Sequence, residues 1–79
     1  MEVTFVVEQA GCESCAARVR AALEPLAAVQ AIEIDEAADA ATVRVSDAGS
    51  QEAVDAALAA ASRGSGHAYR VRPGSWQPA

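Results

Sequence analysis

Four short segments of the chain alternate apolar with polar residues, which is the pattern of a β-strand with one buried face. In the first of them Val3, Phe5 and Val7 share one face, while Thr4 and Val6 lie on the other. The sequence therefore predicts four strands, each with one side against a core. These strands are expected at residues 3–7, 32–35, 42–45 and 69–72.

Two longer segments repeat apolar residues every three or four positions, as amphipathic helices do. The first is expected to end near Pro25, whose ring nitrogen cannot donate a helical hydrogen bond. The second begins after Ser50, a favourable N-cap residue, and should end at the glycines of residues 64–66. Ser14 or a neighbour is expected to cap the first helix.

The element order is therefore β-α-β-β-α-β, which is an α+β fold. A four-stranded antiparallel sheet with two helices on one face buries every apolar surface. Right-handed crossovers place the first and third strands in the centre, with the fourth beside the first. We expect one domain over residues 1–73 and a loosely ordered C-terminal tail over 74–79, with loops at 36–40 and 46–50.

Composition narrows the class of protein. The 79 residues are 52% apolar with a net charge of −5, which suits one small globular domain. Nucleic-acid binding needs basic patches, and none is visible. No apolar run approaches the roughly 20 residues of a membrane span, so no direct membrane insertion is expected. The first apolar run ends at Glu8 and is too short for a signal peptide, so we expect a cytoplasmic protein.

Cys12 and Cys15 are the only cysteines, and they lie where the first strand gives way to the first helix. A helix N-terminus favours thiolate over thiol. Reduced thiols in the cytosol point to metal binding or redox chemistry rather than a structural bridge. Two thiolates suit a soft ion such as Cu(I), Hg(II) or Cd(II). Structural zinc would need four ligands, which here means adding His67 and a carboxylate such as Glu13 or Glu36, or a water.

His67 is the only histidine of the chain. In the expected topology the loop from Gly64 to His67 lies at the same edge of the sheet as the cysteines, and so does the hairpin loop carrying Glu36 and Asp39. His67 is therefore a candidate third metal ligand, or a group close to the ligands. The alternative is an ordinary surface or packing residue.

The segment Gly11-Cys12-Glu13-Ser14-Cys15, set in this element order, resembles the heavy-metal-associated domain family. These are the ferredoxin-like modules of copper chaperones and metal-transporting P-type ATPases, and the likeness runs over residues 3–72. It implies that Cys12 and Cys15 bind Cu(I) or another soft ion and that His67 lies near the metal. The chain departs from the family at Gln9, Ala10 and Gly11, where Gly-Met-Thr is usual. Ala10 would fill less space beneath the metal loop than methionine does.

The function expected from these features is a metallochaperone or metal-transport module without enzymatic activity. Its cargo would be copper(I) in the first place, with zinc, mercury or cadmium as alternatives. The partner would be a metal-transporting P-type ATPase or another heavy-metal-associated domain, met as a monomer or as a metal-bridged dimer. A dithiol/disulfide redox protein is the first competing hypothesis, although Glu13 and Ser14 replace the Gly-Pro of such enzymes. A metal buffer or sensor is the second.

Overall fold

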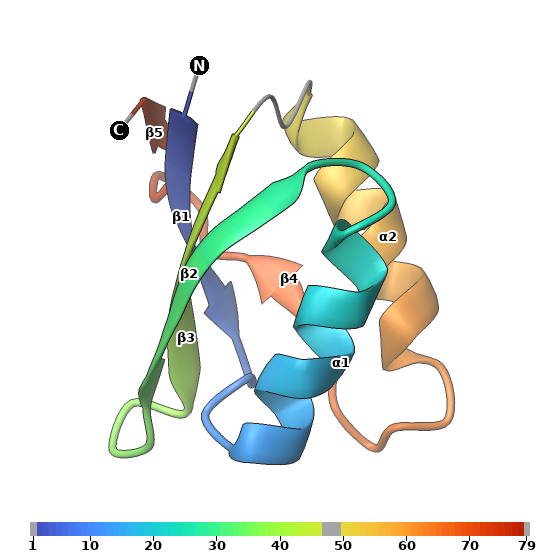
Figure 1. Cartoon of the computed structure of the whole chain (residues 1–79). Coiled ribbons are helices and arrows are strands. Elements are labelled where there is room, and N and C mark those ends of the chain that lie inside the picture. Colours follow the sequence, from blue (N-terminus) through green and yellow to red (C-terminus); the bar gives the residue numbers. More distant parts are fainter. Residues whose placement is uncertain (1, 47–49, 79) are drawn as a thin grey trace.

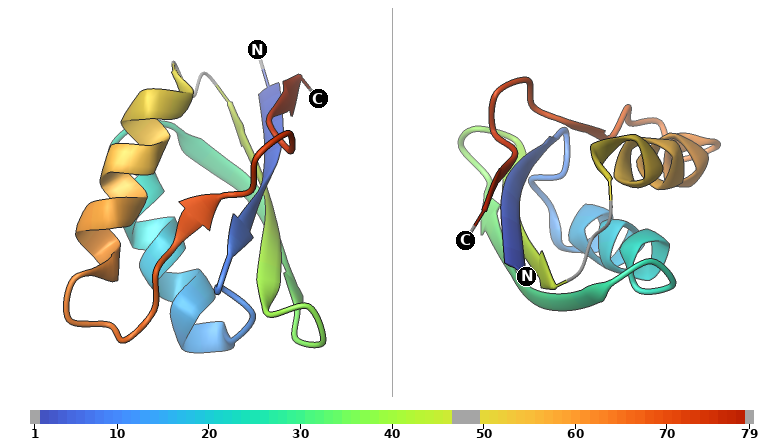
Figure 2. Two further views of the ribbon diagram at one scale, coloured as in Figure 1. Left: turned by 180° about the vertical axis from the view of Figure 1, so that it is seen from behind. Right: turned by 90° about the horizontal axis from the view of Figure 1, so that it is seen from above.

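The computed structural model describes residues 2–46 and 50–78, and it places two helices on one face of an antiparallel sheet (Figures 1 and 2). The expected α+β class is confirmed. The expected loop over residues 46–50 lies partly outside the described residues. In chain order the elements are β1 (Glu2–Glu8), α1 (Glu13–Leu23), β2 (Ala28–Asp35), β3 (Ala40–Ser46), α2 (Gln51–Ser62), β4 (Arg70–Val71) and β5 (Gln77–Pro78).

The sheet order is β2-β3-β1-β4, as the right-handed crossovers predict. β1 pairs with β3 along its whole length, with Phe5 opposite Val43. β2 and β3 form the expected hairpin, with an irregular register between Val29 and Ala31. β4 is only two residues long and pairs with the end of β1, where Val7 lies opposite Val71.

The core lies between the sheet and the two helices. The alternating residues of the strands supply one side of it, because successive side chains of a strand point to opposite faces. Helical positions three and four apart supply the other side. The largest fully buried side chains are Phe5, Val7, Val19, Leu23, Val43, Val45, Val54 and Leu58.

The C-terminal segment contributes a fifth strand that the sequence analysis did not anticipate. β5 pairs with β1, with Thr4 opposite Gln77 and Val3 opposite Pro78. Before β5, the chain turns at Pro73-Gly74, where Gly74 has a φ of 81° that glycine adopts without strain. The edge of β1 is therefore covered first by β4 and then, after the turn, by β5.

Two side chains hold the described part of the tail against β1. The hydroxyl of Ser75 accepts a hydrogen bond from the Val6 N–H at 3.1 Å, in place of a strand carbonyl. The ring of Trp76 stacks on Phe5 with 5.2 Å between ring centroids. Pairing and stacking give residues 75–78 defined positions, where the sequence had suggested a loose tail.

Three loops gather at one end of the molecule, and the two termini lie at the other (Figure 1). They are the cysteine loop between β1 and α1 (residues 9–12), the hairpin loop between β2 and β3 (residues 36–39) and the His67 loop between α2 and β4 (residues 63–69). Cys12 ends the cysteine loop, and Cys15 lies in the first turn of α1. The antiparallel topology requires this arrangement, which the sequence analysis predicted. Within the described ranges, no helix has the length and apolar character needed to cross a bilayer.

Candidate metal site

Cys12 is the N-cap of α1. Its backbone is extended, with φ −132° and ψ 161°, and its sulfur accepts a hydrogen bond from the Cys15 N–H at 3.2 Å. The sequence favoured Ser14 or a neighbour as the cap, whereas the structure places Cys12, two positions before Ser14, at the cap. Ser14 lies inside the first turn, where its hydroxyl oxygen is 3.4 Å from the Cys12 sulfur. The helix therefore begins by surrounding one sulfur with hydrogen-bond donors.

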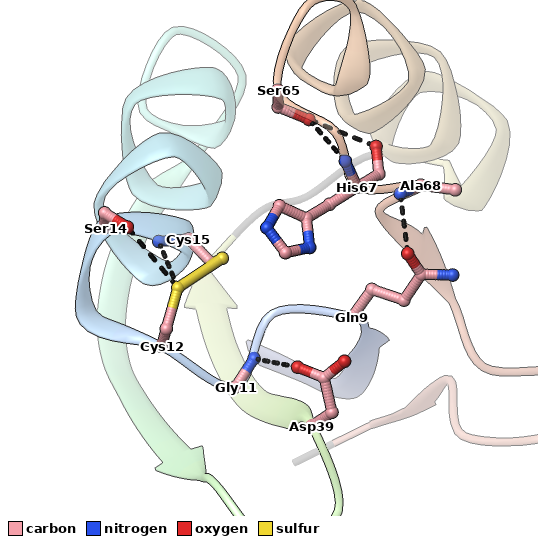
Figure 3. The surroundings of a disulfide bond; sticks show 9 residues. All are labelled: Gln9, Gly11, Cys12, Ser14, Cys15, Asp39, Ser65, His67 and Ala68. Atoms are coloured by element: carbon pink, nitrogen blue, oxygen red, sulfur yellow. Dashed lines mark hydrogen bonds between the residues drawn. A yellow bond between two sulfur atoms is a disulfide. The ribbon is translucent and has the colours of Figure 1, made fainter.

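The sulfurs of Cys12 and Cys15 are joined as a disulfide, and the two Cα atoms are 5.1 Å apart (Figure 3). The residues differ in exposure: Cys15 is buried, with only 2% of its surface exposed, while Cys12 is partly buried. Both sulfurs thus meet at one point at the edge of the core. After reduction, the same backbone brings two thiols within reach of a single ion.

His67 lies on the α2–β4 loop, and in Figure 3 its imidazole points toward the side on which the two sulfurs lie. The backbone N–H of His67 donates a hydrogen bond to the Ser65 hydroxyl at 3.0 Å, and the imidazole ring stacks on the Tyr69 ring with 5.8 Å between centroids. Across residues 2–46 and 50–78, no three or more His, Cys, Asp or Glu side chains are grouped so as to hold a metal. A ligand role for His67 therefore stays a prediction.

Asp39 connects the hairpin loop to the cysteine loop. Its Oδ1 accepts a hydrogen bond from the Gly11 N–H at 3.2 Å (Figure 3). The two backbones also touch, since a Cβ added at Gly11 would lie 2.5 Å from the Asp39 Cα. The sequence pattern predicts Asp39 at this edge but indicates no role for it. A polar residue directly before a strand was the only signal available.

Gln9 connects the cysteine loop to the His67 loop. Its Oε1 accepts a hydrogen bond from the Ala68 N–H at 2.9 Å, across 59 positions of sequence (Figure 3). Ala10, between Gln9 and Gly11, is completely buried. The sequence marks Gln9 only as a departure from the family, because no local pattern indicates so distant a partner.

Glu8, the last residue of β1, forms an ion pair with Arg70, the first residue of β4. The Glu8 carboxylate accepts a hydrogen bond from Arg70 Nε at 2.6 Å and lies 3.5 Å from Arg72 Nε. The hydrogen bond from Arg70, more than any other contact, holds the pKa of Glu8 below its ordinary value. The strand that leads into the cysteine loop is thereby tied to the strand that follows the His67 loop.

Comparisons with known proteins agree with this arrangement. Residues 4–64 match the heavy-metal-associated domain, a stretch that includes both cysteines and both helices. Among solved structures, oxidised MerP from Ralstonia metallidurans CH34 is similar, with a TM-score of 0.60 and 21% identity over 91% of this chain and 99% of that one. At that identity the likeness concerns the fold. A comparison with curated proteins gave no match.

Proposed function

Because this chain belongs to the heavy-metal-associated domain family, we propose that it binds a soft metal ion through Cys12 and Cys15 and passes the ion to a partner. The observation that carries the proposal is the meeting of the two sulfurs at the start of α1, beside two further loops. Soft thiolates select soft ions. No catalysed reaction is part of this role.

The disulfide must be reduced before a metal can bind. A thiol reductant such as glutathione supplies two electrons and two protons, which yields two thiols and one oxidised glutathione disulfide. Each thiol then gives up its proton as its sulfur bonds to the ion. The Cys15 N–H, the Ser14 hydroxyl and the positive end of the α1 dipole favour negative charge on the Cys12 sulfur.

Transfer follows from the unequal exposure of the two cysteines. Cys12 is partly exposed and Cys15 is buried, so a partner can reach the ion more easily on the Cys12 side. A partner thiolate bonds to the ion as a third ligand, and the Cys12–metal bond breaks. A second partner thiolate then displaces Cys15. Two protein ligands leave room for each incoming sulfur, unlike a closed four-ligand zinc site.

Copper(I) is the proposed cargo, with mercury(II), cadmium(II) and zinc(II) as the competing ions. The proposed partner is another heavy-metal-associated domain, including one in a P-type ATPase, met by a monomer or through a metal-bridged dimer. A reducing compartment such as the cytoplasm suits this role, because thiols stay available there. His67 is proposed as a group close to the two sulfur ligands, or as a third ligand that an incoming partner sulfur replaces, since its ring points toward the sulfurs.

Competition for Cu(I) between the reduced protein and a coloured chelator tests the binding. We expect one ion per chain and loss of binding in both Cys12→Ser and Cys15→Ser. Cys12→Ser is a well-matched variant, because serine also caps helices. His67→Ala should weaken binding if the imidazole is a ligand, whereas unchanged affinity would assign His67 to packing on Tyr69. A reduced wild-type protein that leaves Cu(I) with the chelator would contradict the proposal.

Delivery is distinguished from storage or sensing by a second measurement. The loaded protein is mixed with a separate domain that carries a Cys-x-x-Cys pair, and the metal content of both is followed after rapid separation. Exchange within the mixing time supports delivery. Metal that stays on this chain, although the other domain binds it more tightly, favours a buffer or sensor.

The disulfide itself favours a second candidate function, a dithiol/disulfide redox protein. In that reaction the Cys12 thiolate attacks a substrate disulfide and releases one substrate thiol. Cys15 then displaces the second substrate sulfur and closes the Cys12–Cys15 bond. A disulfide-reductase assay with dithiothreitol decides this point. Rapid turnover that Cys15→Ser abolishes, together with no Cu(I) binding, would establish the redox function instead.

A further inference from the structure

Among the described residues, two that are not glycine have a left-handed backbone: Gln9 with φ 62° and Asp39 with φ 50°. Such conformations are strained, and in proteins they gather at functional sites. Both residues flank the cysteine loop here. The side chain of each accepts a hydrogen bond from the backbone of another loop.

Of these two contacts, the one made by Asp39 is nearer to the sulfurs. It holds the N–H of Gly11, the residue directly before Cys12, and Gly11 is buried. The hairpin backbone fits against Gly11 so closely that a Cβ there would meet Asp39 Cα, C and Oδ1 at 2.5, 2.9 and 2.9 Å. The backbone directly before Cys12 is thus held in place by a residue of a different loop, the hairpin loop.

We propose that Asp39 is a positioning residue for the metal-binding loop, one that fixes the Cys12 sulfur by holding the Gly11 N–H. This inference rests on the proposed function, because it concerns how firmly the loop presents its sulfurs. A loop that keeps the binding geometry before the ion arrives loses less conformational entropy on binding. Asp39 acts through the backbone and does not itself touch the ion.

Asp39 has a specific advantage at this position. Aspartate and asparagine tolerate the left-handed conformation better than other residues with a side chain. Asp39→Asn therefore keeps both the backbone conformation and the Oδ1 acceptor. Asp39→Gly keeps the conformation but removes the acceptor. The pair separates the hydrogen bond from the shape of the hairpin, and neither variant introduces strain that would threaten folding.

The test measures Cu(I) affinity of the reduced variants by competition, with unfolding in urea as a check on the fold. Asp39→Gly should bind about tenfold more weakly, at the lower end of the losses seen when groups that orient metal ligands are removed. Asp39→Asn should bind as the wild type does. Asp35→Ala is the matched control, since the Asp35 side chain accepts a hydrogen bond from the Ala38 N–H, within its own hairpin and not from the cysteine loop. Wild-type affinity in Asp39→Gly would overturn the proposal.

A second readout needs no metal and so distinguishes this proposal from the proposed function. The dithiol/disulfide equilibrium of Cys12 and Cys15 is measured against reduced and oxidised glutathione. A loop that holds the sulfurs together favours the disulfide. Asp39→Gly should therefore lower the equilibrium constant for disulfide formation several-fold, whereas Asp39→Asn should keep the wild-type constant. If the wild type binds no Cu(I) and this pattern appears, the function is wrong and the positioning role stands. An equilibrium unchanged in Asp39→Gly would contradict the positioning role.

Discussion

Both helices of this protein begin in the same way, yet only one beginning forms a candidate site. Cys12 and Ser50 are N-caps with extended backbones, at φ −132° and −113°. Each side chain accepts a hydrogen bond at 3.2 Å from the N–H three residues on, and each helix has a glutamate in its first turn. The hydrogen-bond donors and the helix dipole are therefore alike at the N-termini of the two helices.

The surroundings of the two caps differ. Ser50 is exposed, as are the first three residues of α2. Before Cys12 lie the buried Ala10 and Gly11, and the hairpin contacts this stretch through Asp39. A capped helix N-terminus such as that of α2 thus stabilises the helix without forming a binding site. The N-terminus of α1 has the same geometry but forms a candidate site, because its cap is a sulfur and the backbone before the cap is held by the hairpin loop.

Removing the close fit before Cys12 should produce the largest effect. Gly11→Ala places a Cβ 2.5 Å from the Asp39 Cα, so the hairpin or the cysteine loop must move. Such overpacking costs about 1–3 kcal/mol, which a lower urea midpoint would report. Adding Asp39→Gly should not restore stability, because the nearest atoms are backbone. An unchanged midpoint in Gly11→Ala would show that the two loops are not fixed together.

The sequence predicted the frame of this comparison but not its contacts. Alternation and helical periodicity gave the elements, because burial of one face by the other layer determines both patterns. The Ser50 cap followed from the known preference for a hydroxyl at this position. At the first helix the same preference favours Ser14 or a neighbour and does not indicate Cys12, because sulfur is not among the usual capping groups. The topology then brought the cysteine, hairpin and His67 loops to one edge.

What could not be predicted depends on contacts between distant residues. The Asp39 hydrogen bond spans 28 positions and the Gln9 bond spans 59, and no local pattern marks either one. The position of Trp76 likewise depends on pairing of the tail with β1, which leaves its ring over Phe5. These contacts are decided by how the packed layers meet, after the local patterns have set the elements.

A smaller effect is expected when the second cap is removed. Ser50→Ala loses the acceptor for the Ala53 N–H and should lower the free energy of unfolding by about 1 kcal/mol. Its metal affinity should equal that of the wild type, because the α2 cap lies at the end of the molecule opposite the cysteine loop (Figure 1). Urea unfolding and Cu(I) competition on the same preparation measure both quantities. Weaker metal binding in Ser50→Ala would mean that the N-cap of α2 affects the metal site at the N-terminus of α1.

The smallest effect concerns Glu8, at the end of the strand that leads into the α1 cap. The pKa of Glu8 is lower in the folded protein than its ordinary value of 4.5, chiefly because Arg70 donates a hydrogen bond to it. This contribution to stability is complete above about pH 4.5 and is lost as the pH falls through the lower folded value. The effect is modest because Arg70 and Arg72 are exposed, at 67% and 45%.

Glu8→Gln tests this dependence, because glutamine resembles the protonated acid. The thermal midpoints of wild type and variant should differ most near neutral pH and converge as the pH falls below about 4.5. High salt should also reduce the difference, since it screens exposed charges. A difference that stayed constant into acid and in salt would assign the role of Glu8 to packing. The strand before the α1 cap would then be held by side-chain shape rather than by charge.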